Sequence, residues 1–180
     1  MPTPDTIKAA IGFLTIVDDS SHGLFGGYLI LNPTGRPVEF HCTAPVKSNR
    51  AQEILYGSTL KPYLYGEQIA RTLIERSKIL PRVVCLDQPE TLCVRSFLEI
   101  PVVLIQSTAS TKDDAAPQKL GDEKNRIVWK EKQILTPARQ HESDLDEVQK
   151  CLSELLIEFD FMEPFERIRE AIAEAQKVAG

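Results

Sequence analysis

The stretch Arg82-Val-Val-Cys-Leu-Asp87-Gln-Pro-Glu90 is the part of the chain from which the fold can be inferred. A short run rich in β-branched residues ends in a carboxylate, and Pro89 suits the first turn of a following helix. In α/β folds, buried parallel strands deliver polar residues to their carboxyl ends, where ligands usually bind. Asp87 is therefore the first candidate site residue.

The segments on either side of this stretch predict further units of an α/β fold. A helix is expected over residues 62–78, because Ile69, Ala70, Leu73 and Ile74 recur at helical spacing. Another helix is expected from Pro89 onward. Residues 101–105 are apolar without alternation, which is typical of a parallel strand that is buried on both faces.

The N-terminal part predicts an antiparallel meander. Strands are expected at residues 10–17, 28–31 and 37–43, with a loop over 20–27 and a tight turn at Asn32-Pro-Thr-Gly35. A short helix over 49–56 follows, with Ser48 as its expected cap and Gly57 as its end.

The C-terminal part predicts an edge strand and two helices. Residues 126–134 contain Trp129 and charged neighbours, which discourage edge-to-edge pairing. Ser143 is the expected cap of the first helix. The two helices have apolar stripes, formed by Leu145, Val148, Leu152, Leu155, Leu156 and Phe159, and by Phe165, Ile168, Ile172 and Ala175.

Together these elements predict one α/β domain over residues 1–180, with a mixed sheet in three layers. A three-strand antiparallel meander comes first, βα units follow, and two C-terminal helices complete the domain. Residues 1–9 are expected to be a loose end and residues 107–125 a mobile loop. The C-terminal helices, residues 143–180, are expected to dock on the sheet or on a partner chain.

Charge is distributed unevenly along the chain. The net charge is −5, yet residues 143–180 alone hold ten acids and four bases, so the rest is nearly neutral. This pattern argues against a protein held to nucleic acid by bulk electrostatics. The start of the chain lacks a signal-peptide pattern and the longest apolar run, Ile100–Ile105, is too short to span a bilayer, so we expect a cytoplasmic protein that does not bind membranes.

The four cysteines suggest two kinds of site, and both are weak. A zinc site from His41, Cys42, Cys85 and Cys93 lacks the usual ligand spacing, and buried thiols are the simpler interpretation. Cys42 follows His41 directly, but consecutive strand residues point to opposite faces and cannot form a nucleophile–base pair. Alternation instead places Cys42 on the apolar face of its strand.

The order of predicted elements resembles that of the ribonuclease H-like fold. The resemblance implies that Asp18 or Asp19, at the end of the first strand, joins Asp87 in holding divalent Mg²⁺ or Mn²⁺ for phosphodiester cleavage. In that case Asp18, Asp19 and Asp87 are the catalytic acids, with Asp18 and Asp87 as metal ligands. The pair Pro62-Tyr63, at the start of the long helix, resembles the corresponding stretch of endonuclease V proteins.

The chain also departs from this family. The glutamate that the family carries in its first main helix has no clear equivalent here, and Glu67, at the start of the helix, is the nearest candidate. No late acid follows residue 107 apart from those of the C-terminal segment.

A second candidate site lies within residues 39–67, which are dense in polar and aromatic side chains. Alternation places Glu39 and His41 on one face of their strand, where they could line a polar pocket. Lys47 and Arg50 could add affinity for an anion near the start of the short helix. The candidate binding residues are Glu39, His41, Lys47, Arg50, Tyr65 and Glu67. The alternative is that this segment packs over the sheet, with His41 and the tyrosine hydroxyls hydrogen-bonded to backbone.

Two classes of function remain. The preferred one is a non-catalytic binding domain without a cofactor, which contacts a protein partner or a second copy of itself through its C-terminal helices and tyrosine-rich region. The alternative is a metal-dependent nuclease, or a degenerate relative of one, with a ribonuclease H-like core. Only the alternative implies a nucleic-acid partner.

Overall fold

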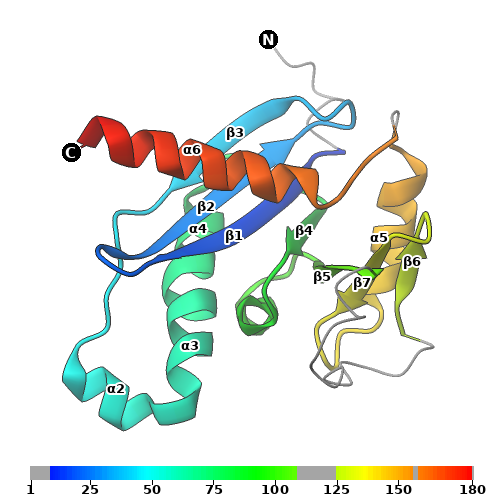
Figure 1. Ribbon diagram of the computed structural model, residues 1–180. Coiled ribbons are helices and arrows are strands. Elements are labelled where there is room, and N and C mark those ends of the chain that lie inside the picture. The colour runs from blue at the N-terminus through cyan, green and yellow to red at the C-terminus, as the bar shows by residue number, and fades with distance from the viewer. Residues whose placement is uncertain (1–8, 109–124, 156–157, 180) are drawn as a thin grey trace.

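The computed structural model describes residues 9–108, 125–155 and 158–179. Nearly all of the expected loose N-terminus, residues 1–9, and of the expected mobile loop, residues 107–125, therefore lies outside the described residues. The described part forms a mixed seven-stranded sheet in the order β3-β2-β1-β4-β5-β7-β6, with helices on both faces (Figure 1). The strands are β1 (Ile11–Asp19), β2 (Gly23–Leu31), β3 (Pro37–Cys42), β4 (Val83–Leu86), β5 (Val102–Ser107), β6 (Ile127–Trp129) and β7 (Gln133–Pro137).

The helical segments connect and cover these strands. They are α2 (Arg50–Tyr56), η1 (Gly57–Thr59), α3 (Leu60–Pro62), the π-helical η2 (Tyr63–Ala70), α4 (Arg71–Arg76), the 3-10 helix η3 (Pro89–Phe97), α5 (Asp144–Ser153) and α6 (Glu163–Ala179). The predicted helix over 62–78 is thus one continuous helical rod of changing pitch, which ends at Arg76. The predicted helix after Pro89 is a 3-10 helix.

The pairing of the strands confirms the predicted fold class. β1 pairs antiparallel with β2, and β2 with β3, which makes the expected meander. β1 and β4 pair in parallel, as do β4 and β5. In the β1–β4 register Leu14 lies beside Leu86, so the next residues along each strand, Thr15 and Asp87, are neighbours. This register positions the candidate site.

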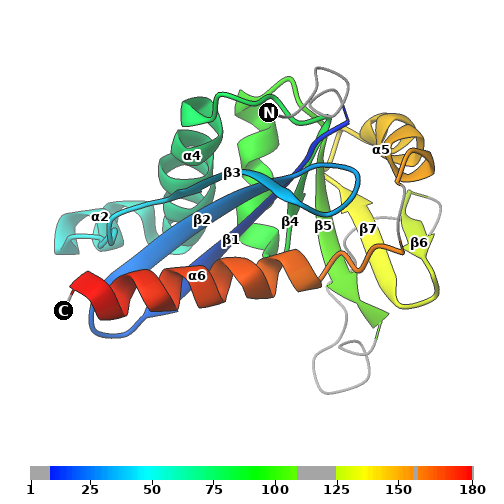
Figure 2. The same ribbon diagram turned by 90° about the horizontal axis from the view of Figure 1, so that it is seen from above.

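Alternation along the strands divides the core into two clusters, one on each face of the sheet. Ile11 and Phe13 of β1 face α5 and α6, whereas Leu14 and Ile16 face η2, α4 and η3. Figure 2 shows α4 and α6 on opposite sides of the β1–β2 part of the sheet. The domain therefore has the predicted three layers.

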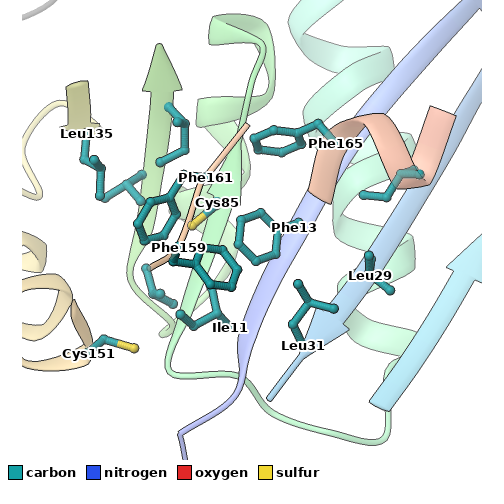
Figure 3. Packing of buried hydrophobic residues seen from close by; sticks show 14 of the residues in the cluster. Ile11, Phe13, Leu29, Leu31, Cys85, Leu135, Cys151, Phe159, Phe161 and Phe165 are labelled. Atoms are coloured by element: carbon teal, nitrogen blue, oxygen red, sulfur yellow. The ribbon is translucent and has the colours of Figure 1, made fainter. Parts of the chain in front are cut away.

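Phe13 is the centre of an aromatic group beneath α6 (Figure 3). Its ring centroid lies 5.7 Å from that of Phe159, 6.2 Å from that of Phe161 and 5.6 Å from that of Phe165. The apolar faces of both C-terminal helices are buried here, so these helices are part of the core of this chain.

β2 begins at Gly23, so the expected loop over 20–27 is wrong for most of its length. Gly26 and Gly27 suggested a loop, but here they are strand residues whose missing side chains admit the helices. A Cβ on Gly26 would lie 2.1 Å from Ile69 Cγ2, and one on Gly27 would lie 2.2 Å from Ile168 Cγ2. Glycine therefore marks close helix–sheet contact on both faces.

Three boundaries in the remaining helices and strands also differ from the expectation. Residues 126–134 contain two strands, because Lys130 and Glu131 both adopt positive φ and turn the chain between β6 and β7. α5 ends at Ser153, well before the end of the predicted stripe. Asn49, rather than Ser48, caps α2, since its side chain accepts from the amide of Gln52.

No helix among the described residues combines the length and apolar composition that crossing a bilayer requires.

Candidate functional site

Asp87 lies at the carboxyl end of β4 and has only 4% of its side chain exposed. Its Oδ2 accepts a hydrogen bond of 3.0 Å from the hydroxyl of Thr15 on β1. The next residue, Gln88, reaches the same strand: its amide side chain bonds the N–H and the carbonyl of Ile16 at 2.9 and 2.8 Å. The side chains of Asp87 and Gln88 therefore hold the end of β4 against β1 beyond the last paired residues of the two strands.

The charged partner of Asp87 comes from the C-terminal helix. Nη2 of Arg169 on α6 forms an ion pair with Oδ2 of Asp87 and lies 3.5 Å from the hydroxyl oxygen of Thr15. The other end of the guanidinium, Nη1, donates to Glu166 on the same helix at 2.5 Å. The arrangement joins β1, β4 and α6 at one point.

Burial raises the pKa of Asp87, although the nearby Arg169 guanidinium and the Thr15 hydrogen bond act to lower it. Oδ1 of the same carboxylate is buried and has no hydrogen-bond partner. A buried charge with an incomplete set of partners is costly. The ion pair with Arg169 is thus the main compensation for keeping Asp87 charged.

The two acids expected to join Asp87 lie elsewhere. Asp18 has the parity of Leu14 and Ile16, so it faces the η2 layer, opposite to the face on which Asp87 meets Arg169. Asp19 shares the face of Thr15 but lies four residues further, about 13 Å along the strand. Its Oδ1 instead accepts from the amides of the turn at Ser21 and His22, at 2.9 and 2.7 Å.

The fit of a divalent metal at this strand end can be judged from the donors present. Two-metal phosphodiester chemistry needs several converging carboxylates, and the polar partners that meet Asp87 here are a hydroxyl and a guanidinium. A fixed cation in contact with the carboxylate repels a second one. The residues therefore do not fit the Mg²⁺ or Mn²⁺ that the resemblance implies, and the described residues contain no group of three or more His, Cys, Asp or Glu side chains placed to hold a metal.

Glu39 and His41 are together, but they belong to a structural contact. Nε2 of His41 lies 2.5 Å from Oε1 of Glu39. The same carboxylate accepts from the amides of Lys78 and Ile79, both at 2.9 Å, and from the hydroxyl of Ser77 at 3.1 Å. Glu39 thus fastens β3 to the turn that follows α4.

This contact reverses the expected faces of β3. The side chains of Glu39 and His41 are 12% and 31% exposed, whereas Phe40 is 40% exposed and Cys42 is also exposed. The predicted apolar face is thus the more exposed one at Phe40 and Cys42, because the 77–79 turn covers and satisfies the Glu39 carboxylate on the other face.

Replacing Glu39 with glutamine is expected to destabilise the protein by about 2 kcal/mol near neutral pH, because hydrogen bonds to a charged carboxylate are lost. Burial raises the pKa of Glu39, but the amides of Lys78 and Ile79, His41 and Ser77 outweigh it and lower the pKa to about 2. This carboxylate therefore adds stability above the unfolded-state pKa near 4.5, and the contribution fades as the pH falls towards 2.

Urea unfolding of the wild type and of Glu39→Gln across this pH range tests the prediction. The two free energies of unfolding should converge at the acidic end. A difference that is the same at all pH values would show that the charge of Glu39 is not what stabilises the turn.

A pocket of about 680 Å³ lies between the β1–β2 turn and the helical arm from α2 to η2. Its apolar side chains are Leu24, Val46, Leu60 and Leu64, and its polar ones include Asp18, Lys47, Glu53, Lys61 and Tyr65. Of the predicted binding residues, Lys47 and Tyr65 line this pocket. Arg50 and Glu67 are exposed nearby, on α2 and η2.

Both lysines in the pocket already have partners. Nζ of Lys47 donates to the carbonyl of Ser21 at 2.9 Å, and Nζ of Lys61 donates to Glu90 at 2.6 Å. The Glu90 contact raises the pKa of Lys61, whose amine also lies 5.2 Å from the centre of the Tyr65 ring. Glu90 thus neutralises Lys61, whereas the Ser21 carbonyl holds Lys47 without neutralising its charge. Arg50, the other residue expected to attract an anion, pairs with Glu53 at 3.1 Å.

Two residues of the strand-end group, Thr15 and Arg169, were absent from the predicted site. Thr15 lies in an otherwise apolar strand, where a buried hydroxyl needs a hydrogen-bond partner. Its presence in the sequence could therefore have indicated a polar contact at this point. Arg169 follows Ile168 directly and precedes Ile172 by three residues, so it borders the apolar stripe of α6. A charged side chain at the border of a buried stripe can reach the sheet.

The sheet order, the parallel β1–β4–β5 core and the C-terminal helix together define an α/β protein with a ribonuclease H-like fold. Among solved structures it is similar to endonuclease V of Ciona intestinalis in complex with inosine-containing DNA, with a TM-score of 0.57 and 10% identity over 96% of this chain and 87% of that chain. Human endonuclease V matches with a TM-score of 0.53 and 12% identity over 95% and 86% of the two chains.

At this identity the likeness establishes the fold alone. No protein-family model matches the sequence, and no curated protein is significantly similar to it.

Proposed function

We propose that this chain is a non-catalytic domain with a ribonuclease H-like fold, and that it acts by binding a partner. The observation that carries the proposal is the hydrogen bond from Thr15 to Asp87. The β1 residue that faces the strand-end carboxylate carries a hydroxyl, and the third group at this point is the guanidinium of Arg169. Such a set supports a structural centre better than a metal-dependent nuclease.

The pocket beside Lys47 and Tyr65 is the binding site that we propose. It lies beside the carboxyl end of β1, and the carboxyl ends of strands are where open α/β sheets commonly bind ligands. Next to it, α2 buries none of its residues and exposes the apolar side chains of Ile54 (67%) and Leu55 (82%). A short helix that buries no side chain gains little stability from packing within its own chain, which favours a partner that covers it.

A protein is the partner that the charges favour. Three acids, Asp18, Asp19 and Glu53, line the pocket with two lysines, and one of these lysines, Lys61, is paired with Glu90. Exposed apolar groups with a residual negative charge suit a protein surface better than a phosphate backbone. The apolar stripes of the C-terminal helices are used inside the chain, so their mainly charged outer faces, with Val178 exposed on α6, remain for the contacts expected of them.

A cleavage assay separates this proposal from the nuclease alternative, which is supported by the fold and by the position of Asp87. Labelled inosine-containing DNA and RNA are incubated with the protein and Mg²⁺ or Mn²⁺, with an endonuclease V as positive control. We expect no cleavage above a protein-free control, and no change in the melting temperature on adding either metal.

Cleavage that Asp87→Asn abolishes would overturn the non-catalytic proposal. Binding of the strands without cleavage, followed by fluorescence anisotropy, would keep the binding role but replace a protein partner with nucleic acid. In that case the variant Leu55→Glu tests whether the strands bind to the exposed apolar surface of α2 beside the pocket.

A further inference from the structure

The contact between Asp87 and Arg169 joins residues that are 82 positions apart in the chain. Asp87 ends β4, and Arg169 lies in the middle of α6, which crosses β1 and β2 (Figure 1). The side chain of Asp87 is 4% exposed and that of Arg169 is 35% exposed. The carboxylate is thus deeply buried, while the arginine reaches it from the surface.

The position of Arg169 is fixed by its neighbours on α6. Ile168 packs against the sheet where Gly27 has no side chain, and Phe165 packs edge-on against Phe13. On the helix surface, Glu166 accepts from Nη1 and leaves Nη2 directed at Asp87. The guanidinium is held in place by the docking of the helix, so it is a preorganised partner for the carboxylate.

A carboxylate at this depth needs a positive partner or a proton. The ribonuclease H-like resemblance implies that divalent metal ions supply that charge. Here the charge comes from a side chain, and Thr15 occupies the β1 position that faces the carboxylate. Oδ2 therefore cannot coordinate a divalent ion without first releasing Arg169, and a divalent ion at the unpartnered Oδ1 would lie beside the guanidinium charge.

We infer that the guanidinium of Arg169 is the permanent counter-ion of Asp87 and takes the place that the resemblance gives to a divalent cation. The ion pair is a metal-independent cross-link that fastens α6 to the carboxyl ends of β1 and β4. This role goes beyond the proposed binding function, since it holds whichever partner occupies the pocket.

A double-mutant cycle tests the cross-link. Arg169→Gln leaves a buried carboxylate without its counter-ion and is expected to lower the melting temperature by roughly 8 °C. Asp87→Asn is expected to cost less, because the freed Arg169 is partly exposed and can turn to water. In the double variant the remaining groups are neutral, so the melting temperature should lie about 4 °C or more above that of Arg169→Gln.

Arg167→Gln is the matched control. It removes the same charge from the same helix, but Arg167 makes only exposed contacts, with Glu163 and with the carbonyl of Gly35, and a loss of only about 2 °C is expected. Adding Mg²⁺, Mn²⁺ or a chelator should shift neither the wild type nor this control.

Additive effects of the two substitutions would overturn the inference, because they would show that Asp87 and Arg169 are not coupled. A metal-dependent rise in melting temperature that Asp87→Asn removes would also overturn it. Should Arg169→Gln fail to fold, Arg169→Lys keeps the charge and is expected to remain folded and metal-insensitive. Neither result depends on whether the protein cleaves nucleic acid.

Discussion

The stability lost in Arg169→Gln is expected to depend strongly on pH, at about 3 kcal/mol near pH 8 and about 1 kcal/mol or less near pH 4. At the higher pH the variant must bury an unpaired carboxylate at Asp87. Burial already raises the pKa of this group in the wild type, against the lowering effects of Arg169 and Thr15. Removing the guanidinium raises it further.

The direction of this pH dependence follows from proton binding by Asp87. In the variant the folded state holds its proton on Asp87 at pH values where the unfolded state, with a pKa near 3.8, has released it. The folded state then binds more protons, so its stability increases as the pH falls through the folded-state pKa. In the wild type the same dependence is weaker, because Arg169 favours the charged form.

Urea unfolding at about pH 8, 6 and 4 measures this effect as a difference between wild type and variant, so that titrations common to both cancel. The groups that face the carboxylate are Arg169 from α6 and Thr15 from β1, with Glu166 behind the guanidinium. The double variant with Asp87→Asn should lose the pH dependence. A difference that stays flat over this range would contradict the prediction, because it would show that removing Arg169 does not change proton binding at Asp87.

Gly27→Val is expected to destabilise the protein by about 4 kcal/mol, or to prevent α6 from docking. A Cβ at this position would lie 2.2 Å from Cγ2 of Ile168 and 3.0 Å from Cδ1 of Ile172. The first distance is far inside van der Waals contact, the second is tighter than ordinary contact, and both isoleucines are buried. The helix would have to move outward, which would also separate Arg169 from Asp87.

Two further variants make this test specific to packing. The double variant Gly27→Ala with Ile168→Ala should lose less stability than the sum of the two single variants, because the second change removes the clashing side-chain atoms. Gly57→Ala is the control: nothing lies within 4 Å of its added Cβ, and only its positive φ of 51° carries a cost, of about 1 kcal/mol. Equal losses in thermal unfolding for Gly27→Ala and Gly57→Ala would contradict the packing explanation.

The strand-end carboxylate illustrates how far reasoning from sequence extends to a site. The run before Asp87 predicted a buried strand, and alternation along β1 was available to place Asp18 and Asp19 on opposite faces. What the local pattern could not supply was the register between β1 and β4, which places Thr15 rather than either acid beside Asp87. Register depends on pairing between segments about 70 residues apart.

The residues that line the pocket were likewise only partly predictable from the sequence. Lys47 and Tyr65 were grouped by local density of polar and aromatic residues, and both line it. Glu39 and His41 belonged to the same stretch of sequence but lie at the turn after α4. Their partners at residues 77–79 are set by the packing of α4 on the sheet, which no short-range pattern contains.

The sequence by itself determined the α/β class, the antiparallel meander, the parallel core strands and the apolar faces of the C-terminal helices. These follow from local periodicity, because burial of one face imposes a repeat on the residues of each element. Only the tertiary structure decided that Arg169 reaches Asp87, and that Gly26 and Gly27 lie within a strand and admit helices on both faces. Those features depend on which surfaces meet, and the physical reason is that close packing and charge pairing act between segments that are distant in the chain.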